Sequence, residues 1–227
     1  MKTVALIPAY NEEKTIKRVI SEIEDVGLVP IVIDDGSTDK TYEISRKMEI
    51  IVIRHSENRG KGEALKTGFN FILKNLPKVR NVVIVDADMQ YSPKDSIRIL
   101  DPLIKGEADF VMGRRNWSTV PLRHRFGNLV WRSIFNLFFE TNLKDTNCGY
   151  MGLSRKALKK IRTIHGGYII ENMMLVEALK HKLRIKQVPV SVTYRTKRSI
   201  IFSGLRMGLG VLVFIIIEGI KYRLSKI

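Results

Sequence analysis

Short runs rich in Val and Ile alternate with helix-like segments through the first half of the chain. The runs cover residues 3–7, 29–33, 50–53 and 82–85, and a fifth fits 109–113. Helical periodicity marks the intervening segments, at about 13–26, 39–48 and 59–76. This order of strands and helices predicts an α/β fold with a mainly parallel, doubly wound central sheet.

Four polar motifs follow four of these strands. They are PAYNEE (8–13), DDGSTD (34–39), NRGKG (58–62) and DADMQ (86–90). Each alone is also compatible with a turn or a helix cap. Because the carboxyl ends of parallel strands meet at one edge of a sheet, we expect the four motifs to share one ligand-binding crevice.

The residue types in this crevice are suited to a nucleotide diphosphate. Asp86 and Asp88 are hard oxygen ligands of the kind that Mg²⁺ or Mn²⁺ prefers when a diphosphate completes the coordination. Tyr10 can stack on a base, Asp34 or Asp35 can accept from ring N–H groups, and Lys61 can meet phosphate. The chain has neither a G-x-G-x-x-G nor a P-loop motif, which argues against a dinucleotide oxidoreductase and a P-loop NTPase.

The charge of the chain is concentrated in its second half. Residues 1–113 carry 17 Lys/Arg against 18 Asp/Glu, whereas residues 114–227 carry 22 against 5. A basic half of this kind indicates an anionic partner, either nucleic acid, anionic lipid or a phosphorylated substrate, unless it is only a solvated surface. The single cysteine, Cys148, excludes an intramolecular disulfide.

Taken together, the motifs resemble the family 2 glycosyltransferases of the GT-A fold, in particular the dolichyl-phosphate sugar synthases. The resemblance rests on the four motifs, on MGRR (112–115) and on DTNCGYMGLSRKAL (145–158). It implies an inverting transfer of a sugar from a UDP- or GDP-sugar to dolichyl or another polyprenyl phosphate. The implied donor-binding residues are Pro8, Tyr10, Glu12, Asp34, Asp35, Lys61, Asp86 and Ala87. The implied ligands of the cation are Asp86, Asp88 and Gln90.

An acceptor phosphate is already anionic, so its transfer needs positioning rather than a general base. The basic half supplies the cations, and we expect the acceptor phosphate to be held by Arg115, Arg125, Arg132, Arg195 and Lys197. We assign the catalytic roles to Asp88, Arg115 and Arg132. The nearest alternative is transfer to a glycan or protein hydroxyl with Glu171 as base. Capping of a helix, or a hydrogen bond to an arginine, is the simpler expectation for Glu171.

Two apolar segments indicate contact with lipid. Residues 125–139 read as a helix that is either buried in the core or placed at a bilayer interface. The apolar run at 207–217 is too short to span a membrane, so we expect an interfacial or shallowly inserted helix, or one that mediates homo-oligomerisation. The predicted organisation is a catalytic domain over 1–198 followed by this helix over 199–227.

The expected location is the cytoplasmic face of the cell membrane, with anionic lipids and either a second copy of the chain or a small membrane subunit as partners. The apolar run before Asn11 is too short for a signal peptide. A non-catalytic binder of membrane or nucleic acid is the alternative from another class. The aromatic residues at 126–139 lie among aliphatic ones, which is atypical of a nucleic-acid platform, so no nucleic acid is expected.

Overall fold

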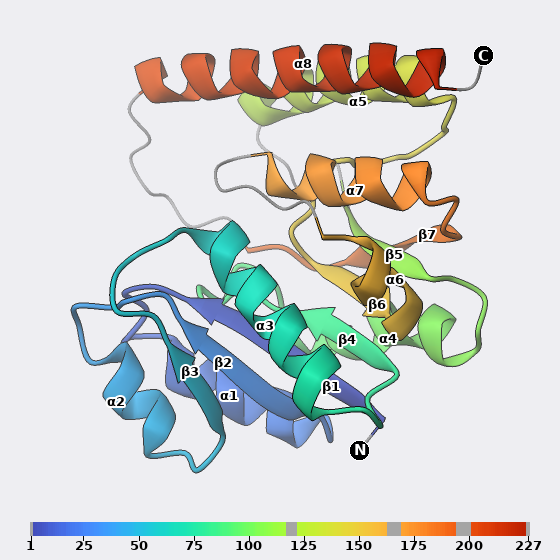
Figure 1. Ribbon diagram of the computed structural model, residues 1–227. Coiled ribbons are helices and arrows are strands. Elements are labelled where there is room, and N and C mark those ends of the chain that lie inside the picture. The colour runs from blue at the N-terminus through green and yellow to red at the C-terminus, as the bar shows by residue number, and fades with distance from the viewer. Residues whose placement is uncertain (1, 117–121, 163–168, 194–200, 226–227) are drawn as a thin grey trace.

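The computed structural model describes residues 2–116, 122–162, 169–193 and 201–225, with only the backbone for 122–126 and 201–207. These residues form one seven-stranded sheet flanked by helices (Figure 1). The strands lie in the order β3-β2-β1-β4-β6-β5-β7. Their bounds are β1 Thr3–Ala9, β2 Val29–Asp34, β3 Ile51–Arg54, β4 Asn81–Ile84, β5 Phe110–Arg115, β6 Met151–Ser154 and β7 Ile185–Val190.

The five expected strands are confirmed, each within two residues at either end. Strand β6 was not expected, and it runs antiparallel to both of its neighbours, β4 and β5. Its sequence, Met-Gly-Leu-Ser, has none of the Val and Ile residues that mark the equally short strands β3 and β4. The sheet is nevertheless mainly parallel, as predicted, because β1 pairs in parallel with β2 and β4, and β5 pairs in parallel with β7.

The helices that connect these strands bury one apolar face each. In α1 the buried residues Ile16, Val19, Ile20 and Ile23 recur at helical spacing. Helix α3 crosses in front of the sheet in Figure 1, and α1 lies behind it. The helices are α1 Ile16–Asp25, α2 Thr41–Arg46, α3 Lys61–Asn75, α4 Ser96–Ile104, α5 Leu122–Phe139, α6 Arg155–Lys160, α7 Ile170–Lys180 and α8 Ile201–Leu224, with a 3-10 turn at Pro93–Asp95.

Helices α5 and α8 pack against each other in a layer beyond α7 (Figure 1). Small residues permit this close approach, because a Cβ atom at Gly219 would lie 2.5 Å from Cβ of Phe138 and one at Gly208 would lie 2.8 Å from the Trp131 ring. Helix α5 starts at Leu122, so Arg125, expected before the helix or at its start, lies within it. The expected tail helix is confirmed as α8.

Helix α8 has three faces with different surroundings. Val211 and Ile215 are buried, and Phe214 and Glu218 lie towards α7. The third face points outward and is apolar: Leu209, Val213, Ile217, Ile220 and Leu224 are each about half exposed or more. No helix in the described part of the chain has both the length and the apolar character that a membrane crossing requires.

Candidate active site

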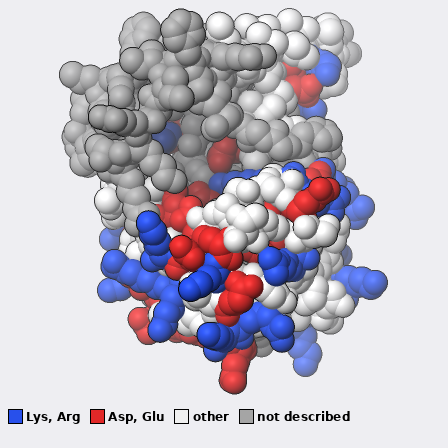
Figure 2. Space-filling view, turned by 90° about the vertical axis from the view of Figure 1, so that its left-hand side faces the viewer, with Lys and Arg blue, Asp and Glu red and all other residues white. Residues whose placement is uncertain are grey.

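The motifs predicted to meet do lie together at the carboxyl ends of β1, β2 and β4. A cavity of about 200 Å³ opens there. Its lining combines the first three motifs: Pro8, Ala9, Tyr10, Asp35, Asn58, Gly60, Lys61 and Ala64. Figure 2 looks onto this edge of the sheet and shows Asp and Glu side chains near its hollowed middle, with Lys and Arg around them.

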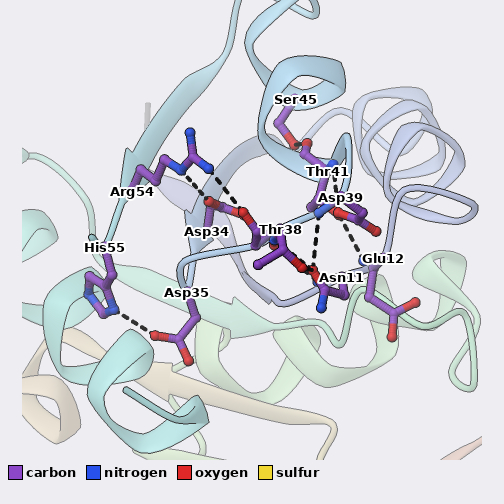
Figure 3. Close-up of polar contacts among 11 residues, drawn as sticks. Asn11, Glu12, Asp34, Asp35, Thr38, Asp39, Thr41, Ser45, Arg54 and His55 are labelled. Atoms are coloured by element: carbon purple, nitrogen blue, oxygen red, sulfur yellow. Dashed lines mark hydrogen bonds and ion pairs between the residues drawn. The ribbon is translucent and has the colours of Figure 1, made fainter. Parts of the chain in front are cut away.

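Hydrogen bonds between the first two motifs fix the shape of this edge (Figure 3). Asn11, which has a positive φ of 54°, accepts from the backbone N–H of Thr38 at 2.9 Å. The backbone N–H of Glu12 donates to Thr41 at 2.8 Å, and its side chain accepts from Thr15. Glu12 therefore contributes to the packing of the two loops, and it is not among the residues that line the cavity.

The two adjacent aspartates at the end of β2 have different environments. Asp34 is fully buried, and a carboxylate oxygen lies 3.2 Å from Nε of Arg54. Burial raises the pKa of Asp34, although Ser37 and Arg54 partly oppose the rise. Of the two aspartates, of which one or both were expected to contact the donor, Asp35 lines the cavity and Asp34 does not.

Asp35 is held by three donors, one of which the sequence did not suggest. Its carboxylate accepts from the backbone N–H groups of Arg59 and Gly60 at 3.0 and 2.7 Å. His55, which is buried, lies 2.7 Å away through Nδ1 and contacts Thr67 through Nε2. A lone histidine at a strand end carries no recognisable signal, and only the fold shows that it orients Asp35.

Lys61 joins two carboxylates from distant parts of the chain. Its ammonium lies 2.6 Å from Asp86 and 3.5 Å from Glu171. Burial opposes the charge, but the two carboxylates outweigh it and raise the pKa of Lys61. Gly149 permits the cluster to form, because a Cβ atom there would lie 3.0 Å from Asp86 and 3.3 Å from both Glu171 and Lys61.

The remaining residues of the DADMQ motif form a tight turn beside this cluster. Asp88 accepts from the backbone N–H of Gln90 at 2.9 Å and so forms an Asx turn, the alternative role with which the motif alone was also compatible. Met89 between them has a φ of 60°, a conformation that a residue with a long side chain adopts only when its surroundings impose it. Ala87 is buried, whereas Asp86, Asp88 and Gln90 are partly exposed.

A cation site made of protein groups alone is absent from the described residues, since they contain no group of three or more His, Cys, Asp or Glu side chains suited to a metal ion. The DADMQ motif offers two carboxylates, Asp86 and Asp88, and Asp86 is already paired with the ammonium group of Lys61. This donor set fits an ion that keeps open positions for substrate phosphates, as Mg²⁺ sites commonly do.

Arg115, expected to hold the acceptor phosphate, is already paired. Its Nε and Nη2 donate to the two carboxylate oxygens of Asp145 at 2.7 and 2.8 Å. Both side chains are largely buried, and the fork-to-fork geometry is the strongest that arginine makes with a carboxylate. In this structure Arg115 therefore fixes the loop at 145–149, and a phosphate contact would have to compete with Asp145.

Arg132 lies on α5, where its Nη1 donates to the carbonyl of Lys144 at 3.1 Å. It thus contacts the residue that precedes the loop at 145–149, which Arg115 also holds. Arg125, Arg195 and Lys197 were also predicted to hold the acceptor phosphate, and their side chains lie outside the described residues.

A series of side-chain amides links this loop to two helices, and no sequence pattern indicated this connection. Asn172 of α7 donates to Asn147 at 2.5 Å, and Asn147 donates to Asn128 of α5 at 3.0 Å. Cys148, the next residue, is buried, and burial raises the pKa of its thiol to about 12. A thiol of this kind is inert at neutral pH and has a packing role.

Known sequences are similar to this chain over most of its length. The profile of Glycosyl transferase family 2 matches residues 4–162. A UDP-N-acetylglucosamine–dolichyl-phosphate N-acetylglucosaminyltransferase of Methanococcus voltae is 31% identical, over 83% of this chain and 84% of the relative. A dolichyl-phosphate hexose transferase of Haloferax volcanii is 30% identical, over 80% of this chain and 78% of the relative. A dolichyl-phosphate beta-glucosyltransferase of Saccharomyces cerevisiae is 27% identical, over 82% and 65%.

Comparison with solved structures supports the fold. Glucosyl-3-phosphoglycerate synthase of Mycobacterium tuberculosis, in complex with phosphoglyceric acid, has a TM-score of 0.77 and 24% identity, over 96% of this chain and 79% of that chain. A complex of the same enzyme with Mn²⁺, UDP and glucosyl-3-phosphoglycerate has a TM-score of 0.75. The predicted GT-A fold is thereby confirmed, and the chain belongs to glycosyl transferase family 2.

Proposed function

We propose that this protein transfers a sugar from a nucleotide-sugar donor to dolichyl or another polyprenyl phosphate. The names of three relatives support a lipid-phosphate acceptor. The observation that carries the proposal is the combination of a polar transfer site at one edge of the sheet with a layer, α5 and α8, whose outer face is apolar. A water-soluble acceptor requires no such face.

The donor nucleoside occupies the cavity lined by Tyr10 and Asp35. Tyr10 is 43% exposed, so its ring is available to stack on a base, and Asp35 offers an acceptor oriented by His55 and the loop amides. With the nucleoside in this cavity, the diphosphate attached to it would lie next to Lys61, at the start of α3. Its charge and the first N–H groups of α3 favour an anion at that place.

Asp86 and Asp88 would hold Mg²⁺ or Mn²⁺ together with the donor diphosphate, with Gln90 as a further oxygen ligand. A cation bound there neutralises the charge that develops on the leaving nucleoside diphosphate. Mn²⁺ and UDP are both present in a solved structure with this fold, which supports the same chemistry.

The reaction is one in-line displacement with inversion. An oxygen of the acceptor phosphate forms a bond to the anomeric carbon, and the bond from that carbon to the diphosphate oxygen breaks with its electron pair. Because the nucleophile is already ionised, no residue has to remove a proton. Glu171 is ion-paired to Lys61, which is consistent with a positioning role and not with that of a free base.

The apolar outer face supports association with a membrane. It is formed by Leu209, Val213, Ile217 and Leu224 of α8 and by Leu129 and Leu137 of α5, all of them about half exposed or more. An interfacial helix pair inserts such a face to the depth of the head groups, where basic side chains meet anionic lipid. The cytoplasmic face is the side that we propose, because nucleotide sugars are made there.

The alternative within the same fold is a glycan or protein hydroxyl as acceptor, with Glu171 as base. The single favourable observation is that Glu171 lies within 3.5 Å of a residue of the donor cavity. The test is to supply purified protein with Mg²⁺ or Mn²⁺, a panel of UDP- and GDP-sugars, and either polyprenyl phosphate or the corresponding polyprenol. We expect a lipid-linked sugar from the phosphate only. Product from the polyprenol, or no lipid product from any donor, would contradict the proposal.

A further inference from the structure

A second cavity, of about 410 Å³, lies between α7 and α8 and is larger than the donor cavity. Four apolar side chains and four charged ones line it: Ile169, Met173, Val176, Glu177, Lys180, Phe214, Glu218 and Lys221. We call it the α7–α8 groove. None of these residues has a part in the transfer chemistry described above.

The helical repeat forms this groove from one face of each helix. On α7 the lining residues recur every three or four positions from Ile169 to Lys180, and on α8 they do so from Phe214 to Lys221. The apolar residues of α7 lie towards its N-terminal end, and the charged residues follow at its C-terminal end. The groove is therefore apolar at one end and charged at the other.

The charged end is neutral as a group. Lys180 lies 2.7 Å from Glu218 and 3.6 Å from Glu177, and Lys221 lies 2.8 Å from Glu218. Two acids and two bases that satisfy one another do not require an ionic ligand. The available binding energy of the groove thus comes from its apolar part, which suits an uncharged hydrocarbon ligand.

The apolar end lies next to the transfer site. Ile169 and Met173 flank Glu171 in the sequence, and Glu171 reaches Lys61 at 3.5 Å from another face of the same helical turn. A chain attached to a phosphate at the transfer site would pass the N-terminal end of α7 and enter the groove at Ile169. The first units of such a chain would lie outside the groove, and only later units would fill it.

We propose that the α7–α8 groove receives the isoprenoid chain of the acceptor lipid. This inference rests on the proposed function and assigns the part of the protein that recognises the chain and not the phosphate. It accounts for a groove whose apolar end lies near Glu171 and whose charged end carries no net charge. It also predicts that the protein distinguishes acceptors by chain length.

The test uses variants in which a larger side chain fills the groove. Their activity is compared with two acceptors in detergent micelles, a long-chain polyprenyl phosphate and one with two isoprene units. Ile169→Trp and Phe214→Trp narrow the groove from opposite helices, and Ile104→Trp adds the same ring to an exposed site on α4. We expect each groove variant to raise the KM for the long acceptor roughly tenfold, which corresponds to the loss of about one well-buried aliphatic contact. The KM for the short acceptor and for the donor should not change, and Ile104→Trp should match the wild type.

Equal changes for the two acceptors, or no change for either, would overturn the inference. A binding measurement separates it from the proposed function. In Phe214→Trp, a long-chain polyprenol without phosphate should shift the additional tryptophan emission to shorter wavelength, whether or not the protein transfers sugar. The absence of this shift counts against the groove, whereas failure of the wild type to glycosylate any polyprenyl phosphate counts against the proposed function.

Discussion

Lys61 and Asp86 form an ion pair of 2.6 Å between the first turn of α3 and the end of β4. The pair joins the loop that lines the donor cavity to the carboxylate expected to bind the cation. A diphosphate that enters the site offers Lys61 a second anionic partner, and a divalent cation offers Asp86 a second cationic one. Binding of the donor with its metal ion thus exchanges one ion pair for two, which avoids leaving either charge uncompensated.

Replacement of Lys61 by methionine should weaken donor binding. A charge-assisted hydrogen bond contributes about 1.5–3 kcal/mol, so we expect the KM for the nucleotide sugar to rise roughly 10- to 100-fold. Lys66→Met on the same helix is the matched control, because Lys66 pairs with Glu63 at 2.7 Å in an ordinary helical ion pair. Steady-state kinetics with varied donor measures both variants, and equal KM values would exclude a role of Lys61 in donor binding.

In Asp88→Asn the side-chain oxygen can still accept from the backbone N–H of Gln90, but the negative charge that the cation needs is lost. We expect turnover to fall by at least about 100-fold, as when an electrostatic stabiliser of a transition state is removed. The thermal stabilisation that Mn²⁺ and nucleoside diphosphate produce together should also be lost. Asp101→Asn, at a half-exposed helical ion pair on α4, provides the control. Retained metal-dependent stabilisation in Asp88→Asn would remove Asp88 from the metal site.

The sequence was sufficient to predict those features that depend on local periodicity. Five strands and the three helices between them follow from Val/Ile runs and amphipathic spacing, and the carboxyl ends of the strands gather the motifs as expected. Strand β6 was missed because its four residues include no Val or Ile, unlike those of β3 and β4. Residues 125–139 lie in α5, in which Phe135 is buried in the core and Leu137 is 68% exposed, and their placement at a bilayer interface stays a prediction.

The contacts of individual charged residues could not be predicted in the same way. The sequence gives the type of a side chain but not which distant partner reaches it first. Arg115 was expected to bind the acceptor phosphate, and in the structure it is paired with Asp145, 30 positions away in the sequence. Glu171 was expected to cap a helix or bind an arginine, and its partner is Lys61. Both outcomes depend on how the loop at 145–149 packs between the sheet and α7.

Glu171→Gln distinguishes the two kinds of acceptor. If the acceptor is a phosphate, the variant loses only one partner of Lys61, and turnover should fall less than about tenfold, the effect of one modest electrostatic contact. If a hydroxyl is the acceptor, loss of the base should cost about 100-fold or more. Comparison of kcat for the variant and the wild type at saturating polyprenyl phosphate decides between the two reactions.

Acid should weaken the fold in part through Asp109. Hydrogen bonds from Arg184, together with Lys156, lower the pKa of this carboxyl to about 2. Because the unfolded pKa is near 3.9, the stabilisation is complete above about pH 5 and is lost as the pH falls towards 2. The upper limit is about 2–3 kcal/mol, and screening reduces it because Arg184 and Lys156 are more than half exposed. Urea unfolding of Asp109→Asn should show a flatter loss of stability over this range, whereas Glu107→Gln, at an exposed pair, should follow the wild type.

The outer face of α8 provides the sharpest test of membrane association. Val213 and Ile217 are 53% and 48% exposed and lie one turn apart on that face. The double variant Val213→Asp with Ile217→Asp replaces two side chains, each of which would contribute about 1.5–3 kcal/mol on insertion, so affinity for vesicles with anionic lipid should fall by roughly 100-fold or more.

The double variant Ile97→Asp with Ile104→Asp makes the same changes at two exposed aliphatic sites on α4, where we expect no loss of vesicle binding. Flotation with vesicles gives the affinities, and size-exclusion chromatography in buffer reports the oligomeric state. If the apolar face is instead covered by a second copy of the chain, the α8 variant should change from dimer to monomer while vesicle binding stays as in the wild type. The face of α8 is assigned to lipid only if vesicle binding is lost and the oligomeric state is unchanged, because a bilayer and a protein partner compete for the same apolar surface.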